Sequence, residues 1–204
     1  MYARVAVFEN PDLSRIDELM ATVGERARAG GDIPGAKRVI ALVDREAARM
    51  VGITLFETEE AIREAEPRFE RMGEEIPEEL RGKRASVGIY EVAIDDIAEG
   101  ARAARLSALE GSPEKIDEGL EYIKGQIVPM LTDISGSRGV IALVDRTSGK
   151  TKTITFWDGI ESLQASEARA DELRSEAAAA MAETIKGVHR YEVALIESLT
   201  PAPV

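Results

Sequence analysis

The chain contains 204 residues, 44% of them hydrophobic and 31% charged, with a formal net charge of −12 and no cysteine. The lack of cysteine excludes disulfides, thiolate nucleophiles and sulfur-ligated metals, and the acidic balance makes nucleic acid an unfavourable partner. No apolar stretch approaches the roughly 18–20 residues that cross a bilayer, and the opening MYARVAVFEN does not read as a secretory signal, so we expect no membrane association and a cytoplasmic location.

Hydrophobic periodicity predicts strands and helices along the first half of the chain. In chain order the predicted elements are a strand over residues 3–9, a helix over 13–27, a hairpin of strands over 39–44 and 50–57, a helix over 62–72 and a strand over 86–94. Asn10-Pro11-Asp12 predicts the start of the first helix, because it combines a capping side chain with proline at the first helical position. Gly73 and Pro77 predict that the second helix breaks and restarts as a short turn.

The second half repeats the first at a constant offset. VIALVDR occurs at Val39–Arg45 and again at Val140–Arg146, 101 positions later, and YEVA occurs at Tyr90–Ala93 and again at Tyr191–Ala194. Such self-similarity indicates an internal duplication. The matching elements of the second half are a helix begun by Ser112-Pro113-Glu114, a hairpin over 140–145 and 152–158, a helix from 163 that continues nearly to residue 186, and a strand over 188–196.

Each half has the order β-α-β-β-α-β, which is the ferredoxin-like pattern of a four-stranded antiparallel sheet with both helices on one face. We therefore predict an α+β fold of two tandem modules, residues 1–95 and 102–198, joined by a linker over 96–101. The strands are apolar on both faces, with Val39 pointing one way and Ile40 the other, so the face without helices also needs burial. The modules are expected to pack sheet-to-sheet as an intrachain α+β barrel. Gly24 and Gly125 occupy the same place in the two first helices, which predicts a close approach of helix and sheet.

Three phrases of the second half occur in a known family: SGSRG at Ser135–Gly139, ITFW at Ile154–Trp157 and ASEAR at Ala165–Arg169. The first half keeps a weaker version, with Phe56 in place of Trp157. The chain resembles the antibiotic biosynthesis monooxygenase family of the dimeric α+β barrel superfamily, in a tandem two-domain arrangement. The resemblance implies quinone-forming oxygenases, which need no cofactor and use Asn, Trp, Tyr and Arg side chains, or haem-degrading enzymes, which use an Asn, Trp and His set.

The resemblance marks four aromatic residues as candidates for the site. Trp157 and Tyr191 are the candidate catalytic residues, and Phe56 and Tyr90, at the equivalent positions of the first half, are candidate pocket-lining residues. Each also has a structural interpretation: Trp157 as a packing residue that caps the core, and the tyrosines as strand residues with their rings in the core.

The haem-degrading set is incomplete in both halves. Asn10 is the only asparagine and lies in the first half, Trp157 lies in the second, and His189, the only histidine, falls in the predicted last strand rather than on the second helix. We therefore expect no cofactor. We also expect no metal, because acidic runs such as Glu59-Glu60 have no ligating histidine near them.

Two arginines, Arg4 and Arg105, recur on the first strands of the halves. In a pocket such a side chain can hold a carboxylate or an enolate in a fork of hydrogen bonds, and at the seam between modules it would pair with a glutamate of the other module. We favour the seam.

Three functions fit these observations. The first is a cofactor-independent monooxygenase acting on a phenolic or polycyclic aromatic small molecule, bound in an apolar pocket of the second copy. The second is a non-catalytic barrel that binds a ligand or regulates another process, and the third is an isomerase or lyase on the same barrel. The expected partner is a small aromatic ligand, and the chain is expected to be a monomeric pseudo-dimer or a dimer of pseudo-dimers.

Overall fold

The computed structural model describes residues 1–29, 33–180 and 182–199. In chain order its elements are β1 (Tyr2–Glu9), α1 (Ile16–Arg28), β2 (Ala36–Asp44), β3 (Arg49–Phe56), α2 (Glu59–Glu75), α3 (Glu78–Arg81), β4 (Lys83–Ile97), β5 (Ala103–Glu110), the 3-10 turn η1 (Pro113–Lys115), α4 (Ile116–Tyr122), the π-helical turn η2 (Ile123–Ile127), α5 (Val128–Asp133), β6 (Ser137–Asp145), β7 (Lys150–Trp157), α6 (Ile160–Ala165), α7 (Glu167–Ala180) and β8 (Thr184–Ser198). Hydrogen bonds join the strands in the order β1-β3-β2-β8-β5-β7-β6-β4, the order of a closed barrel. The predicted α+β class and barrel are confirmed.

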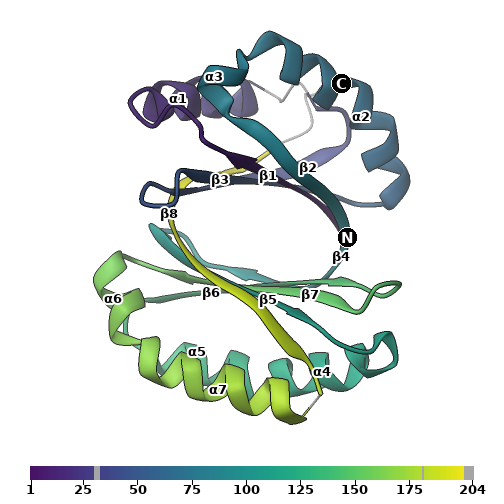
Figure 1. The fold of residues 1–204 in the computed structure, drawn as a ribbon, viewed down its shortest axis with the longest axis vertical. Coiled ribbons are helices and arrows are strands. Elements are labelled where there is room, and N and C mark those ends of the chain that lie inside the picture. The colour runs from purple at the N-terminus through teal and green to yellow at the C-terminus, as the bar shows by residue number, and fades with distance from the viewer. Residues whose placement is uncertain (30–32, 181, 200–204) are drawn as a thin grey trace. The chain divides into compact units, whose positions relative to one another are not determined.

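The residues group into two compact units, which are described separately: unit 1 is Met1–Tyr90 with Val193–Val204, and unit 2 is Glu91–Glu192. In unit 1, β1 and β2 both pair antiparallel with β3, and α1 and α2 lie over one face of these strands (Figure 1). Ile16 and Met20 of α1 pack against Val43 of β2 in one buried cluster. Full burial of such a side chain is worth roughly 1.5–3 kcal/mol, and this fixes the helix on the sheet.

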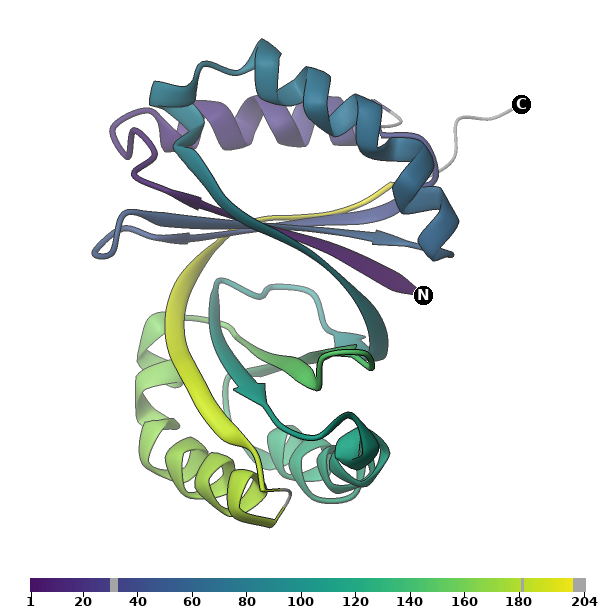
Figure 2. The same ribbon diagram turned by 45° about the vertical axis from the view of Figure 1, so that its right-hand side comes forward.

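Unit 2 repeats this arrangement. β5 and β6 both pair antiparallel with β7. The helical segments α4, η2 and α5 follow one another without a break, and together with α7 they lie along one face of the strands (Figure 2). Trp157 at the end of β7 packs with Leu131 of α5, Val140 of β6 and Leu163 of α6.

β4 and β8 are the longest strands, with 15 residues each, and both belong to two units. β4 enters unit 2 at Glu91, where it pairs with β6, and β8 leaves unit 2 after Glu192, where its pairing with β5 ends. β4 also continues to Ile97, into the predicted linker over 96–101. Each unit therefore combines strand segments from both copies of the repeat, and the module boundaries drawn from the sequence stay a prediction.

The start of α1 differs from the prediction. Asn10 has a φ of 55°, its N–H donates to the carbonyl oxygen of Ala48, and the helix begins only at Ile16. Between them, Asp12 Oδ1 accepts hydrogen bonds from the backbone N–H and the hydroxyl of Ser14. The predicted cap is wrong because Asn and Asp also suit a turn, and here both serve the turn that precedes the helix. In unit 2 the matching proline begins η1 rather than a regular helix.

The second helix of the first copy fits the prediction in part. α2 runs through Gly73 and ends at Glu75, just before Pro77, and α3 then forms one short turn. The predicted break at Pro77 is confirmed, and the break at Gly73 is wrong. A single glycine costs a helix about 1 kcal/mol, which packing on the sheet outweighs.

The second helix of the second copy is divided where continuity was predicted. The hydroxyl of Ser166 donates to the carbonyl oxygen of Leu163 at 2.7 Å, and Nη2 of Arg105 donates to the same oxygen at 2.8 Å. This carbonyl is therefore occupied where a continuous helix would use it, and α6 ends one residue before Ser166. α7 ends at Ala180, short of the predicted end, and Met181 lies outside the described residues.

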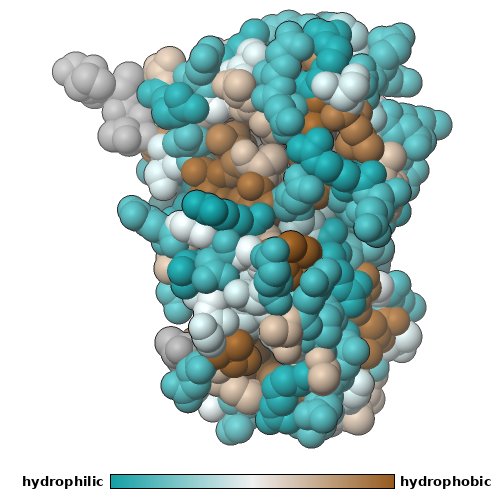
Figure 3. All heavy atoms as spheres, turned by 90° about the vertical axis from the view of Figure 1, so that its left-hand side faces the viewer, coloured by the Kyte–Doolittle hydropathy of each residue, from teal (hydrophilic) through white to brown (hydrophobic). Residues whose placement is uncertain are grey.

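The surface mixes apolar and hydrophilic groups. Seen from one side, apolar side chains reach the surface in several places, separated by hydrophilic ones (Figure 3). Among the described residues, no helix is both long enough and apolar enough to cross a membrane.

Candidate functional site: two cavities between helices and sheet

Each unit contains a cavity between its helices and the sheet face that they cover. Cavity 1, in unit 1, measures about 660 Å³ and is bounded by α1, α2 and strands β1 to β3. Cavity 2, in unit 2, measures about 110 Å³ and is bounded by α4, η2, α7 and strands β5 to β7. Small-molecule sites usually measure about 300–1,000 Å³, so cavity 1 has room for a polycyclic ligand and cavity 2 only for a small one. The small pocket predicted in the second copy is present as cavity 2, and the larger space lies in the first copy.

The two cavities are built from equivalent positions. Residues 101 positions apart line both walls: Arg4 and Arg105, Leu19 and Leu120, Ala41 and Ala142, Thr54 and Thr155. Both cavities therefore descend from one site of the duplicated module, and each has an arginine from its first strand on the wall.

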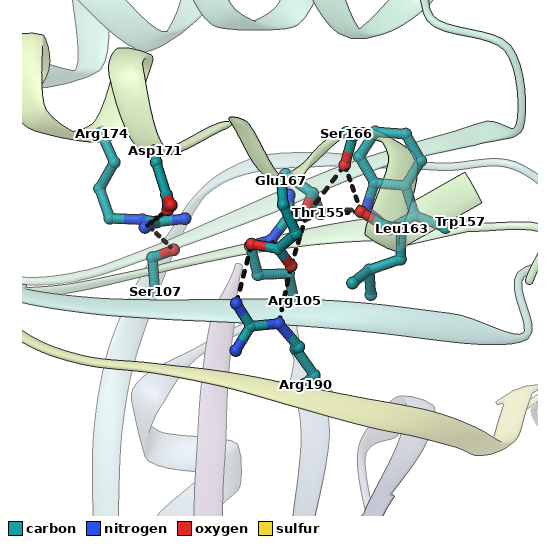
Figure 4. A network of polar contacts seen from close by, with 10 residues as sticks. All are labelled: Arg105, Ser107, Thr155, Trp157, Leu163, Ser166, Glu167, Asp171, Arg174 and Arg190. Carbon is teal, nitrogen blue, oxygen red and sulfur yellow. Dashed lines mark hydrogen bonds and ion pairs between the residues drawn. The ribbon is translucent and has the colours of Figure 1, made fainter. Parts of the chain in front are cut away.

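In cavity 2 this arginine is Arg105, which is 2% exposed. Its Nη2 donates to the carbonyl oxygen of Leu163 at 2.8 Å and to Oγ of Ser166 at 2.9 Å, and it lies 3.0 Å from Oε1 of Glu167 (Figure 4). Arg190 of β8 also binds Glu167, through Nε at 2.7 Å and Nη2 at 2.8 Å. The carboxylate of Glu167, at the start of α7, thus forms ion pairs with two guanidinium groups.

The charges of this network influence one another. Burial lowers the pKa of the Arg105 guanidinium, Glu167 opposes the effect, and the positive charges of Arg174 and Arg190 add to it. Burial alone would raise the pKa of Glu167, but the hydrogen bonds from Arg190 and Arg105 outweigh it and hold this pKa below its usual value. Arginine keeps its proton in proteins even so, and both partners are charged at neutral pH.

In cavity 1 the equivalent arginine is Arg4, which is 5% exposed. It donates to Glu66 of α2 through Nε at 2.9 Å and Nη2 at 2.8 Å, and its guanidinium carbon lies 3.9 Å from the ring centroid of Phe69. These hydrogen bonds lower the pKa of Glu66. Arg4 therefore makes a bidentate ion pair and a cation–π contact at the wall of the cavity.

Both arginines pair with a glutamate of their own unit, 62 residues further along the chain. The seam pairing that we favoured is wrong. A sequence signal for the correct pairing exists, because Glu66 and Glu167 recur at the same offset as Arg4 and Arg105.

Trp157 lines cavity 2 and is 1% exposed. Its Nε1–H donates to Oγ1 of Thr155 at 3.1 Å, and its ring centroid lies 5.7 Å from the guanidinium carbon of Arg105. Tyr191 is also buried, but it pairs across the sheet with Ala104, the residue before Arg105. Successive residues of a strand point to opposite faces, so Tyr191 points away from the helices. The structure does not bring the two candidate catalytic residues together.

The candidate pocket-lining residues of the first copy lie off the wall of cavity 1. Phe56 is fully buried and packs edge-on against Phe69, with 6.3 Å between ring centroids, and it is Phe69 that lines the cavity. Tyr90 is half-buried and covers Gly88, where an added Cβ would lie 2.8 Å from the tyrosine ring. Of the four aromatic candidates, Trp157 alone borders either of these two cavities.

His189 also lies away from both cavities. It pairs with Leu106 on β5, which places it on the same face as Tyr191, and their ring centroids are 6.3 Å apart. Within the part of the chain that the structure describes, no three His, Asp or Glu side chains gather as metal ligands would.

The floors of the two cavities differ in chemistry. On the strands, unit 1 presents Ala6, Met50 and Gly52, whereas unit 2 presents Ser107, Thr151 and Thr153 at the equivalent positions. A Cβ added at Gly52 would meet no heavy atom within 4 Å, as expected above an open floor. On the helices, Gly73 of α2 corresponds to Arg174 of α7. The strand floor of cavity 1 is therefore less polar and more open than that of cavity 2, which carries additional hydroxyl groups.

Solved structures share this fold. An anthrone oxidase-like protein aligns with a TM-score of 0.69 at 14% identity, over all of this chain and 96% of its own. A monooxygenase-like protein of Listeria innocua aligns with a TM-score of 0.55 at 11% identity, over 94% of this chain and 93% of its own. A haem-degrading enzyme of Listeria monocytogenes gives 0.54 at 11%, over 94% and 99%. The fold is that of monooxygenase-like α+β barrel proteins, and at such identities the likeness shows the fold alone.

Sequence relatives carry no assigned activity. Rv2558, an uncharacterised protein of Mycobacterium tuberculosis, is 31% identical over 99 residues, which span 48% of this chain and 42% of Rv2558. Rv2557, also uncharacterised and from the same organism, is 26% identical over 145 residues, 69% of this chain and 64% of its own length. The chain thus matches less than two thirds of either relative. No family profile matches it.

Proposed function

We propose that cavity 1 binds a phenolic or polycyclic aromatic molecule and that the chain acts on it as a cofactor-independent monooxygenase. The observation that carries the proposal is the cavity of about 660 Å³, whose wall combines apolar side chains with the buried guanidinium of Arg4. Flat aromatic ligands fit such a space, and a few fixed polar groups orient them. The anthrone oxidase-like protein of the same fold supports this substrate class.

Arg4 suits an anionic substrate oxygen. Its Nε and Nη2 are directed to Glu66, which leaves the Nη1 protons for a phenolate or enolate. In this class of reaction the deprotonated substrate itself reduces dioxygen: anthrone and O₂ give anthraquinone and water. The protein then has to bind, orient and stabilise the anion, and no metal or flavin is needed to balance the electrons.

The alternative is a barrel that binds the same kind of molecule without reacting with it. One observation favours this alternative: two glutamates that pair with arginines at or beside cavity 1 are weak bases. Glu75 on the wall of cavity 1 has its pKa lowered by hydrogen bonds from Arg68, and Glu66 has its pKa lowered by Arg4. A carboxylate with a lowered pKa is a weak base.

Methionine labelling distinguishes these possibilities. Met20, Met50 and Met72 line cavity 1, and Met130 of α5 does not line it. With [¹³C-methyl]methionine, 1,8-dihydroxyanthrone should shift the signals of the first three and leave that of Met130 in place. Oxygen uptake above the rate in buffer, with one quinone formed per O₂, would support the monooxygenase.

Gly52→Val provides the variant, since its side chain would fill the open floor of cavity 1, and Thr153→Val in cavity 2 is the matched control. Gly52→Val should abolish both the shifts and the oxygen uptake, and Thr153→Val should change neither. Shifts without oxygen uptake would favour the non-catalytic barrel. If none of the three methionine signals moves, both proposals fail.

A further inference from the structure

Several hydrogen-bond donors of cavity 2 have no acceptor among the residues that the structure describes. Ser107 of β5 lies directly opposite Thr153 of β7, and Arg105 lies opposite Thr155, so these four side chains form one patch on the floor. Oγ of Ser107 accepts from Arg174, and Oγ1 of Thr155 accepts from Trp157. A hydroxyl that accepts a hydrogen bond still has its own proton to donate.

Arg174 covers this patch on the side of the helices. It reaches down from α7, its side chain is 11% exposed, and its Nε donates to Oγ of Ser107 at 3.1 Å (Figure 4). Its Nη1 donates to Oδ1 of Asp171 at 2.6 Å, and its Nη2 has no partner among the described residues. The hydroxyl of Thr153, beside Ser107, likewise has no partner in the described part of the chain.

The local charge balance is positive although the chain is acidic. Three guanidinium groups, those of Arg105, Arg174 and Arg190, share the two carboxylates of Glu167 and Asp171. Asp171 is 61% exposed, so water screens much of its charge. The cavity wall therefore has one positive charge that is incompletely balanced.

One of the residues that line cavity 2 is acidic. Glu183 follows α7, and burial raises the pKa of its carboxyl. This carboxyl therefore takes up a proton at a higher pH than an exposed glutamate does.

Most of the remaining wall is apolar, with Leu109, Leu120, Ile123 and Ile127 among its residues. An inorganic anion has no apolar part that could contact these side chains. A dianion would carry more negative charge than the single unbalanced positive charge of the wall. A monoanion with an apolar body matches both parts of the wall.

We infer that cavity 2 binds a small monocarboxylate with a compact apolar body, whose carboxylate is held by Arg174, Ser107 and Thr153. The volume of about 110 Å³ limits the body to one ring or a short branched chain. Cavity 1 has Gly73, Ala6 and Gly52 at the equivalent positions and cannot provide these donors. The inference concerns the second unit only and does not depend on the function proposed for cavity 1.

Benzoate is the probe, and benzamide, its neutral analogue of the same shape, is the comparison. Trp157 is the only tryptophan and lines cavity 2, so its fluorescence reports binding, and calorimetry gives the affinity. We expect benzoate to bind at least tenfold more tightly than benzamide. Thr153→Val, which keeps the shape of the side chain, and Arg174→Gln should each weaken benzoate binding at least tenfold.

Asp171→Asn should act in the opposite direction and strengthen benzoate binding several-fold, because it frees Nη1 of Arg174. Glu176→Gln, on the exposed side of the same helix and off the cavity wall, should leave the affinity unchanged. Thermal unfolding of each variant separates loss of binding from loss of fold. The methionine signals of cavity 1 should not move when benzoate is added.

Four results would overturn the inference: no binding of benzoate at millimolar concentration, equal affinity for benzamide, an unchanged affinity in both Thr153→Val and Arg174→Gln, or inorganic phosphate bound as tightly as benzoate. Shifts of Met20 and Met50 on adding benzoate would also overturn it, because they would place the probe in cavity 1.

Discussion

Glu167 neutralises two arginines, and one of them lies almost entirely out of contact with water. In Glu167→Gln, Arg105 stays charged at 2% exposure without a carboxylate to neutralise it. We expect the free energy of unfolding to fall by about 3 kcal/mol, the lower end of the range for breaking a buried ion pair. Urea denaturation at pH 7 measures it.

The control is Glu172→Gln, five positions further along α7, whose partner Arg169 is exposed. Surface ion pairs contribute little, so this variant should unfold like the wild type. If both variants lose the same small amount of free energy, Glu167 does not stabilise a buried charge, and the account of the network is wrong.

Acid should weaken the fold through the same pairs. The pKa values of Glu66 and Glu167 in the folded chain lie below the ordinary value of 4.5, because arginines donate hydrogen bonds to them. The unfolded chain therefore binds more protons than the folded chain below that value, and stability is lost as the pH falls. We expect the free energy of unfolding to decline between about pH 5 and about pH 3.

The double variant Glu66→Gln, Glu167→Gln is less stable at pH 7 but should show a shallower decline over the same range. Denaturation curves collected at several pH values compare the two slopes. Parallel slopes would mean that other carboxyl groups dominate the acid transition.

At the scale of residues, the sequence predicts where Trp157 lies but not what Arg4 and Arg105 contact. Alternation along a strand usually tells which face a residue points to. Ala3, Arg4 and Val5 are all buried, so burial on both faces removes this signal. The same ambiguity applies to the face of Tyr191, since a buried tyrosine fits either face of the sheet.

At the scale of elements, two glycines that look equivalent in the sequence are not equivalent in the structure. A Cβ at Gly24 of α1 would lie 3.1 Å from Cδ1 of Leu195, which confirms the expected close packing. A Cβ at Gly125 of η2 would meet nothing within 4 Å, so close packing is wrong there. Gly125→Ala should raise the free energy of unfolding by about 1 kcal/mol, the usual advantage of alanine over glycine in a helix.

Gly24→Ala should gain less than Gly125→Ala, or lose stability, because Leu195 and Arg28 would have to move. Paired thermal and urea unfolding of the two variants provides the comparison. Equal gains would show that the space around Gly24 adjusts without cost.

The repeat predicts the order of the elements because hydrophobic periodicity is local. It does not predict the division between α6 and α7, since that depends on Arg105 reaching the carbonyl oxygen of Leu163 from 58 residues away. The break at Pro77 is predicted correctly because proline acts through its own backbone.

At the scale of the molecule, neither copy of the repeat contains a complete unit. Unit 1 includes β8 from Val193 onward, and unit 2 includes β4 from Glu91 onward. In the strand order β8 lies next to β2, and β4 next to β6. A chain cut between the copies would therefore leave hydrogen-bonding edges unpaired in both fragments, and exposed edges recruit other strands.

We therefore expect a fragment of residues 1–101 to fold poorly as a monomer and to associate with itself, because a second copy can lend its strand over 83–97 to the place of β8. Fragments 1–101 and 102–204 expressed together should instead associate one to one and regain the circular dichroism spectrum of the whole chain. Light scattering after gel filtration gives the stoichiometry. A monomeric 1–101 with a cooperative unfolding transition would show that the first copy folds without β8, contrary to the division into units seen here.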